Sequence, residues 1–234
     1  MSAKSITSFV YNLIQEARNS VTYIALRAQL FRIRLTVLAS FLAALTGVLG
    51  ALVLAHLTGA QLDWLTRDPG IIGQRGFYVG ILSNVGIMIL AAATAICFFS
   101  AFVLQGLHTY RDTSLFLLSS GGVCLMLTCD DAFLLHEQVF PIYLGVPAIV
   151  VYLVYSTLAG GYFIYFGKRI LSTDYLLLVL AFLFLGLSLL VDGLLSRSDV
   201  QTFIEDSLKF AGIVFLWAYY TRTTTTAVGA ALTN

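Results

Sequence analysis

Charged residues are scarce in this sequence: Asp, Glu, Lys and Arg together make up 11% of its 234 residues. Soluble domains contain about 25% of such residues. Hydrophobic residues make up 59% and the mean hydropathy is +0.91, so the composition excludes an ordinary soluble domain. The formal net charge of +1 provides no extended basic surface, and nucleic acid is therefore not an expected partner.

Cysteine and histidine are also few, with three of each. The spacing between Cys124 and Cys129 does not match the C-x-x-C pattern of redox or zinc sites. The zinc-protease motif H-E-x-x-H is absent, because Gln, Val and Phe follow His136 and Glu137. The serine-hydrolase elbow, the phosphate-binding loop and the dinucleotide glycine pattern are absent too, so no familiar catalytic signature assigns a reaction.

Long apolar runs make up most of the chain. In lipid a helix satisfies its own backbone hydrogen bonds, so such runs predict helices. The sequence therefore predicts an all-α, multi-pass integral protein of the cell (inner) membrane, built as a bundle of six transmembrane helices. The expected spans lie near residues 35–57, 77–107, 114–135, 146–166, 175–195 and 203–220.

Two flanking segments differ from the predicted transmembrane domain, 35–222. In residues 1–34, charged side chains alternate with apolar ones at helical spacing, which predicts an amphipathic helix on the membrane surface. Residues 223–234 are rich in Thr and have few apolar side chains to bury, which predicts a flexible tail.

Lysine and arginine are unevenly distributed between the predicted loops, and this bias predicts orientation. With both termini in the cytoplasm, the cytoplasmic side collects Lys4, Arg18, Arg27, Arg32, Arg34, Arg111, Lys168, Arg169 and Arg222. The opposite, outer side collects only Arg67, Arg75 and Arg197.

Most of the unusual ionisable residues fall at the outer ends of three predicted spans. Charge inside a membrane is costly, so a cluster of ionisable groups there indicates a functional site. The candidate cluster for a cation or protons consists of Asp130, Asp131, His136, Glu137, Asp192 and Glu205, with Lys209 and Asp206 as ion-pair partners.

Helical geometry predicts how these side chains are grouped. On a continuous helix, Asp130 and Glu137 lie two turns apart on nearly the same face. Glu205 and Lys209 form an i,i+4 pair, and we expect this pair to face Asp130 and Glu137 across the bundle. Gly212 continues the face of Glu205 and Lys209, and it leaves room for another helix or a ligand.

Four chemical hypotheses fit this cluster. The first is a divalent-cation site; its oxygen-rich ligands favour calcium, magnesium or manganese over zinc. The second is proton or ion coupling in transport. The third is a metal-dependent enzyme that acts on a lipid-like substrate at the outer leaflet, with His136 and Glu137 as catalytic candidates. The fourth is an ion-pair lock in a structural or assembly subunit.

The preferred hypothesis is binding of a cation or protons in transport or ion coupling. The expected partners are membrane lipid and further subunits, in either a homo-oligomer or a larger membrane complex.

Overall fold

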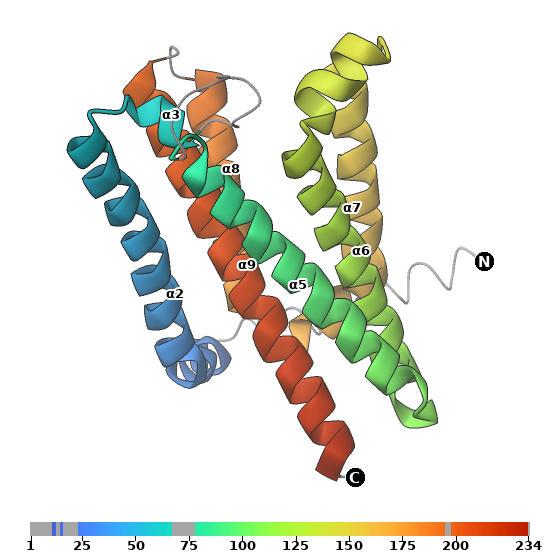
Figure 1. Ribbon diagram of the computed structural model, residues 1–234. Helices are drawn as coiled ribbons and strands as arrows, with labels where there is room; N and C mark the ends of the chain where they lie inside the picture. The colour runs from blue at the N-terminus through green and yellow to red at the C-terminus, as the bar shows by residue number, and fades with distance from the viewer. Residues whose placement is uncertain (1–10, 13–14, 16–22, 67–77, 195–197, 234) are drawn as a thin grey trace.

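The computed structural model describes residues 11–12, 15, 23–66, 78–194 and 198–233, and these residues are helical apart from short turns (Figure 1). In chain order the elements are α2 (Tyr23–Thr58), α3 (Leu62–Thr66), α5 (Ile81–Gln105), the short 3-10 helix η1 (His108–Tyr110), α6 (Arg111–Phe133), the π-helical segment η2 (Leu135–Tyr143), α7 (Ala148–Leu171), α8 (Tyr175–Leu194) and α9 (Asp199–Thr233). The described part contains no strand.

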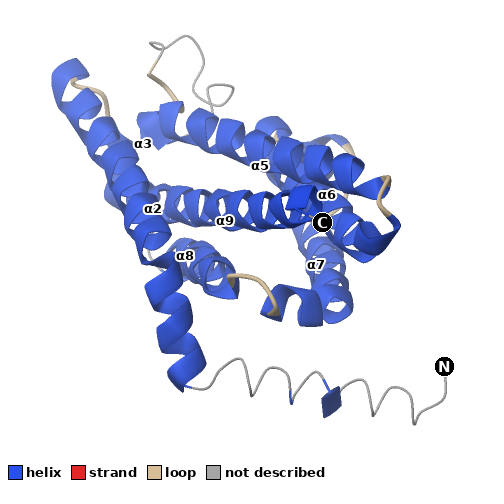
Figure 2. Ribbon diagram, turned by 90° about the horizontal axis from the view of Figure 1, so that it is seen from below, coloured by secondary structure: helices blue, strands red, loops and turns tan. Residues whose placement is uncertain are grey.

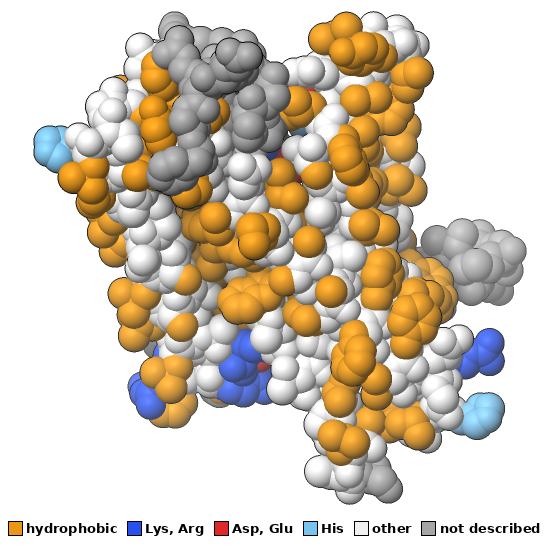
Figure 3. Space-filling view, in the orientation of Figure 1, with side chains coloured by type: hydrophobic (Ala, Val, Ile, Leu, Met, Phe, Trp, Pro, Cys, Tyr) orange, Lys and Arg blue, Asp and Glu red, His pale blue; other side chains and the backbone are white. Residues whose placement is uncertain are grey.

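Among the described residues, five helices are long and apolar enough to cross a membrane, namely α2, α5, α6, α7 and α8. The long helices run alternately up and down in Figure 1, so the bundle has two opposite ends. Hydrophobic side chains cover much of the face in Figure 3, and most of the Lys and Arg side chains visible there lie toward its lower end. The all-helical fold predicted from composition is therefore confirmed, and the length and apolar composition of these helices support a membrane bundle.

Helix α9 is less apolar than α2, α5, α7 and α8, and it occupies the interior of the bundle. It packs against α8, α5, α2 and α3, and Figure 2 shows it between α2, α5 and α8. Its buried side chains include the polar Gln201, Thr223 and Thr224 as well as the aromatic Tyr219 and Tyr220. A less apolar helix is compatible with a membrane bundle when more apolar helices cover it.

The predicted boundary at residue 34 does not interrupt the first helix. Helix α2 is continuous from Tyr23 to Thr58, so Arg27 and Arg32 lie on the same helix as the first predicted span. Most of the expected surface helix, together with the outer-side residues Arg67, Arg75 and Arg197, lies outside the described residues.

The Thr-rich segment 223–233 is helical where a flexible tail was expected. Its hydroxyl groups find acceptors within the helix, because they donate to carbonyl groups one turn back, as in Thr224 to Tyr220 at 2.8 Å and Thr225 to Thr221 at 2.7 Å. Further along, the hydroxyl of Tyr110 donates to the carbonyl of Ala230 at 2.9 Å. The segment therefore has polar contacts that a count of apolar residues overlooks.

Gly212 brings α9 into close contact with α8. A Cβ atom at this position would lie 2.7 Å from Cγ of Leu185 and 3.0 Å from the backbone oxygen of Ala181. The room predicted beside Gly212 is therefore filled by a neighbouring helix.

We expect Gly212→Ala to destabilise the bundle by about 1–3 kcal/mol, because the backbone of α8 cannot move away from the added methyl group. The matched control is Gly186→Ala on α8, where an added Cβ meets nothing within 4 Å. That control should be neutral or stabilising by less than about 1 kcal/mol. Equilibrium unfolding in detergent micelles measures both, and equal stability of the two variants would contradict the tight α8–α9 contact.

Candidate functional site

The candidate site begins where α6 stops being an α-helix. Helix α6 ends at Phe133, and Leu134 adopts the left-handed conformation with φ 52° and ψ 44°. The π-helical segment η2 follows and contains Pro141. The helix was expected to continue to residue 135, so the expected alignment of Asp130 with Glu137 on one helix face is wrong.

The break folds His136 back onto Asp130. The carboxylate of Asp130 is 6% exposed and accepts three hydrogen bonds. The backbone N–H of His136 donates to Oδ1 at 3.1 Å, the hydroxyl of Tyr155 donates to Oδ1 at 2.9 Å, and Nδ1 of His136 lies 2.5 Å from Oδ2. One buried carboxylate therefore connects α6, η2 and α7.

The imidazole of His136 lies between two carboxylates. Its hydrogen bond to Asp130 raises the pKa of His136 above the ordinary value of 6.5, although burial acts in the opposite direction. Its Nε2 lies 3.6 Å from Oε1 of Glu137, whose side chain is 50% exposed. The ring of Tyr152 lies 5.3 Å from the imidazole ring, centroid to centroid. The favoured state is an imidazolium held by Asp130.

Asp131 forms a second ion pair at the same end of the bundle. Nζ of Lys209 donates to Oδ1 of Asp131 at 2.7 Å, which links α6 to α9. The side chain of Asp131 is 13% exposed. The bond joins two opposite charges, of which Asp131 is largely removed from water whereas the side chain of Lys209 is 38% exposed.

The remaining acidic side chains of α9 lie next to this pair. Nε2 of Gln201 donates to Oε2 of Glu205 at 3.3 Å and to the carbonyl of Val191 at 3.3 Å. Oε1 of Gln201 is buried and has no partner among the described residues. Asp206 lies close to the side chain of Thr66.

The residues of the predicted cluster lie at one end of the bundle, but their ion pairs differ from the expected ones. Glu137, Asp192 and Asp206 act electrostatically on Glu205, and Glu137 also acts on Lys209, so the charged groups of η2, α8 and α9 lie near one another. Within the described ranges, the ion-pair partner of Lys209 is Asp131 and not Glu205. Asp192 is exposed at the end of α8.

A metal-binding arrangement is not found in the part of the chain that the structure describes. There, no three His, Cys, Asp or Glu side chains are placed so that they could hold one ion. Of the catalytic candidates, His136 contacts Asp130 and the ring of Tyr152, and Glu137 lies beside His136.

Sequence reasoning did not identify Tyr155 or Gln201 as part of this site. A signal for Tyr155 exists, because Tyr155, Tyr162 and Arg169 are spaced by seven residues and so share one face of α7. All three reach α6: Tyr155 bonds to Asp130, Tyr162 to Ser120 at 2.8 Å, and Arg169 to the hydroxyl of Thr113. No comparable spacing identifies Gln201.

Buried hydroxyl groups continue from the site into the middle of the bundle. Thr128, two residues before Asp130, lies 3.5 Å from Thr94, oxygen to oxygen. Deeper in the bundle, the buried Tyr220 lies beside Tyr162 and Cys124. Beside it, the hydroxyl of Tyr219 lies 3.0 Å from Oγ1 of Thr173, which directly precedes Asp174 near the opposite end. These eight residues place seven hydroxyl groups and one thiol between the two ends of the bundle. We call them the hydroxyl ladder: Thr94, Ser120, Cys124, Thr128, Tyr162, Thr173, Tyr219 and Tyr220.

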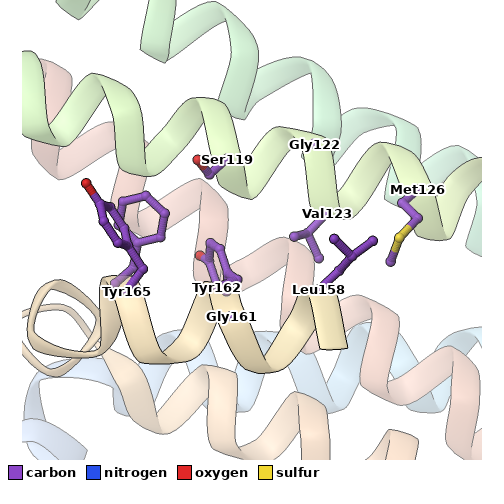
Figure 4. Close-up of a pocket in the computed structure, with 9 residues that line it drawn as sticks. Ser119, Gly122, Val123, Met126, Leu158, Gly161, Tyr162 and Tyr165 are labelled. Atoms are coloured by element: carbon purple, nitrogen blue, oxygen red, sulfur yellow. The ribbon is translucent and has the colours of Figure 1, made fainter. Parts of the chain in front are cut away.

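A gap separates α6 from α7 between their hydrogen bonds. It has a volume of ≈ 360 Å³, and its lining residues include Gly122 and Met126 of α6 and Leu158, Gly161 and Tyr165 of α7. Figure 4 shows these side chains between the two helices. Helix α7 is therefore joined to α6 by separate polar contacts and by the packing of Phe116 against Tyr162 and Phe166, with an open gap beside them.

We expect the stability of the wild-type protein to depend on pH through His136. Because the pKa of His136 is raised in the folded state, its stabilising contribution is complete below the unfolded value of 6.5 and is lost as pH rises through the folded value. His136→Gln should lack this loss of stability. Equilibrium unfolding in detergent between about pH 5 and about pH 9 measures the difference.

The control for this measurement is His56→Gln, which removes an exposed histidine at the end of α2. This variant should keep the wild-type dependence of stability on pH. A His136→Gln profile that is parallel to the wild-type profile would contradict an imidazolium held by Asp130.

Comparison with known proteins gives a family for most of the chain. Residues 35–223 match the model of a family described as a domain of unknown function (DUF8692), and the chain belongs to this family. No curated protein and no solved structure matches the chain.

Proposed function

We propose that this member of the DUF8692 family binds protons or a small cation at the end of the bundle that contains Asp130, in transport or ion coupling across the cell (inner) membrane. The observation that carries the proposal is the buried Asp130–His136 pair, in which Nδ1 lies 2.5 Å from Oδ2. Such a pair holds a proton between a carboxylate and an imidazole, the two groups used most often in proton relays through membranes.

The hydroxyl ladder supports this proposal over a purely structural lock. A lock needs only the charged groups at one end, whereas coupling across a membrane needs polar groups through the middle. Tyr219 is 0% exposed and Tyr220 is 2% exposed, and both carry hydroxyl groups into the interior of the bundle. Tyr162 and Ser120 add a further hydroxyl pair at 2.8 Å.

We further propose that α9 is a sixth membrane-spanning helix and that both termini lie in the cytoplasm. Helix α9 has 35 residues and packs against the more apolar helices α2, α5 and α8. Arg32, Arg169 and Arg222 lie around the cavity that contains Asp174, at the end of the bundle opposite Asp130. Because Lys and Arg are in excess on the cytoplasmic side of membrane proteins, this end is the cytoplasmic one in our proposal. The site around Asp130 then opens to the outer side.

We expect Asp130→Asn to slow proton movement into liposomes containing the purified protein by about a hundredfold, because the amide cannot exchange a proton with His136. A pH-sensitive dye inside the vesicles, with an imposed potassium diffusion potential, measures the rate. Asp192→Asn is the matched control, since Asp192 is exposed at the same end of the bundle and should retain wild-type flux.

Elemental analysis of the same preparations separates a proton from a bound metal. Metal present in the wild-type protein and lost in Glu137→Gln identifies the cation as a metal ion. Wild-type flux in Asp130→Asn, or no flux in the wild-type protein above empty vesicles, would contradict the proposal.

We expect Tyr220→Phe to reduce the same flux roughly tenfold or more, because it removes one hydroxyl from the middle of the ladder and leaves the ring in place. The control is Tyr165→Phe, which removes a hydroxyl from a tyrosine that is 69% exposed on α7. Equal flux in the two variants would show that the ladder does not conduct protons.

A further inference from the structure

A second polar cavity lies at the end of the bundle opposite Asp130. Its volume is ≈ 370 Å³, and residues of α2, α6, α7, α9 and the turn before α8 line it. Three arginines contribute to its wall, namely Arg32 of α2, Arg169 of α7 and Arg222 of α9. Charged groups on three separate helices therefore converge on one cavity.

One carboxylate faces these three arginines. Oδ1 of Asp174 lies 2.6 Å from Nη2 of Arg32, and Oδ2 accepts a hydrogen bond from Nε of Arg222 at 2.8 Å. Nη1 of Arg222 donates to the hydroxyl of Thr36 at 2.9 Å. Both oxygens of Asp174 are thus used, and the cavity keeps an excess of positive charge.

Arg169 is the arginine whose charge is not matched. Its Nη2 donates to the hydroxyl of Thr113, and among the described residues no carboxylate lies within ion-pair distance of it. Its side chain is exposed toward the cavity. A guanidinium group has five N–H donors, so Arg169 retains donors for a ligand after it has bonded to Thr113.

We propose that this cavity binds the phosphate group of an anionic ligand, with Arg169 as the principal contact. Guanidinium groups bind phosphate through paired hydrogen bonds, and several arginines around one cavity favour an anion strongly. The phosphate belongs either to a lipid headgroup or to a soluble compound, since the chemistry of recognition is the same. This site is independent of the function proposed for Asp130.

The competing explanation is that the arginines only neutralise Asp174 and hold the helices together. This explanation accounts for Arg32 and Arg222, which both pair with Asp174. It gives no reason for a charged group at position 169, because a neutral donor would serve the hydroxyl of Thr113 equally well. Arg169 therefore distinguishes the two explanations.

The test uses full-length purified protein from which bound lipid has been removed by detergent exchange. In one arm, native mass spectrometry measures retention of phosphatidic acid from nanodiscs of phosphatidylcholine with or without that lipid. In the other arm, inorganic phosphate is titrated at constant ionic strength and the thermal unfolding midpoint is followed, since a ligand that binds the folded state raises it.

We expect Arg169→Gln to weaken binding about tenfold or more, the effect of losing hydrogen bonds to a charged group. Lys168→Gln removes the same charge from the neighbouring residue, which does not line the cavity, and should bind like the wild-type protein. Thr113→Val removes the hydrogen bond to Arg169 but keeps its charge, and should also retain binding.

The two arms of the binding test separate a lipid headgroup from a soluble ligand. Binding in the lipid arm alone supports a headgroup, and binding in the phosphate arm alone supports a soluble ligand. The proposal is overturned if neither probe binds, if Arg169→Gln binds like the wild-type protein, or if Lys168→Gln loses as much binding, which indicates a general basic surface. Equal loss in Thr113→Val also overturns it, because the role of Arg169 is then structural.

Discussion

A carboxylate that is 6% exposed inside an apolar bundle requires donors around it, because removing one partner of a buried charge costs about 3–5 kcal/mol. Asp130 meets this requirement with donors from η2 and α7. The left-handed Leu134 makes the arrangement possible, since it ends α6 and turns His136 back toward Asp130. A non-glycine residue in this conformation costs about 1–2 kcal/mol, and the hydrogen bonds to Asp130 offset that cost.

Hydrogen bonds also help to hold α7 against α6. Helices in lipid gain little from the hydrophobic effect when they associate, so close packing and polar contacts determine which of them pair. Helix α7 contacts α6 at Asp130, Ser120 and Thr113, with an open gap near Gly161. Helices α8 and α9 instead associate by close packing, with the two backbones approaching each other at Gly212.

Composition and charge predicted the helical membrane bundle, because apolar length alone specifies helices in lipid. The pairing within the site was not predictable in the same way. The expected alignment of Asp130 with Glu137 assumed an unbroken helix, and no glycine or proline stands at Leu134 to indicate the break. The pairing of Lys209 with Asp131 depends on the rotation of α9 relative to α6, which the sequence of either helix alone does not determine. The segment 223–233 was misjudged because threonine counts as polar, although its hydroxyl can bond within its own helix.

Helix α9 contributes polar residues to both ends of the bundle and to its middle. Lys209 pairs with Asp131 near one end, Tyr220 contacts Tyr162 and Cys124 in the middle, and Arg222 pairs with Asp174 at the cavity. Because Gly212 fixes α9 against α8, these two helices are expected to move together. The polar contacts and open gap between α6 and α7 make that pair easier to displace. Lys209 and Arg222 lie on the same helix, so α9 holds the ion pair with Asp131 and the ion pair with Asp174 at a fixed distance along the bundle.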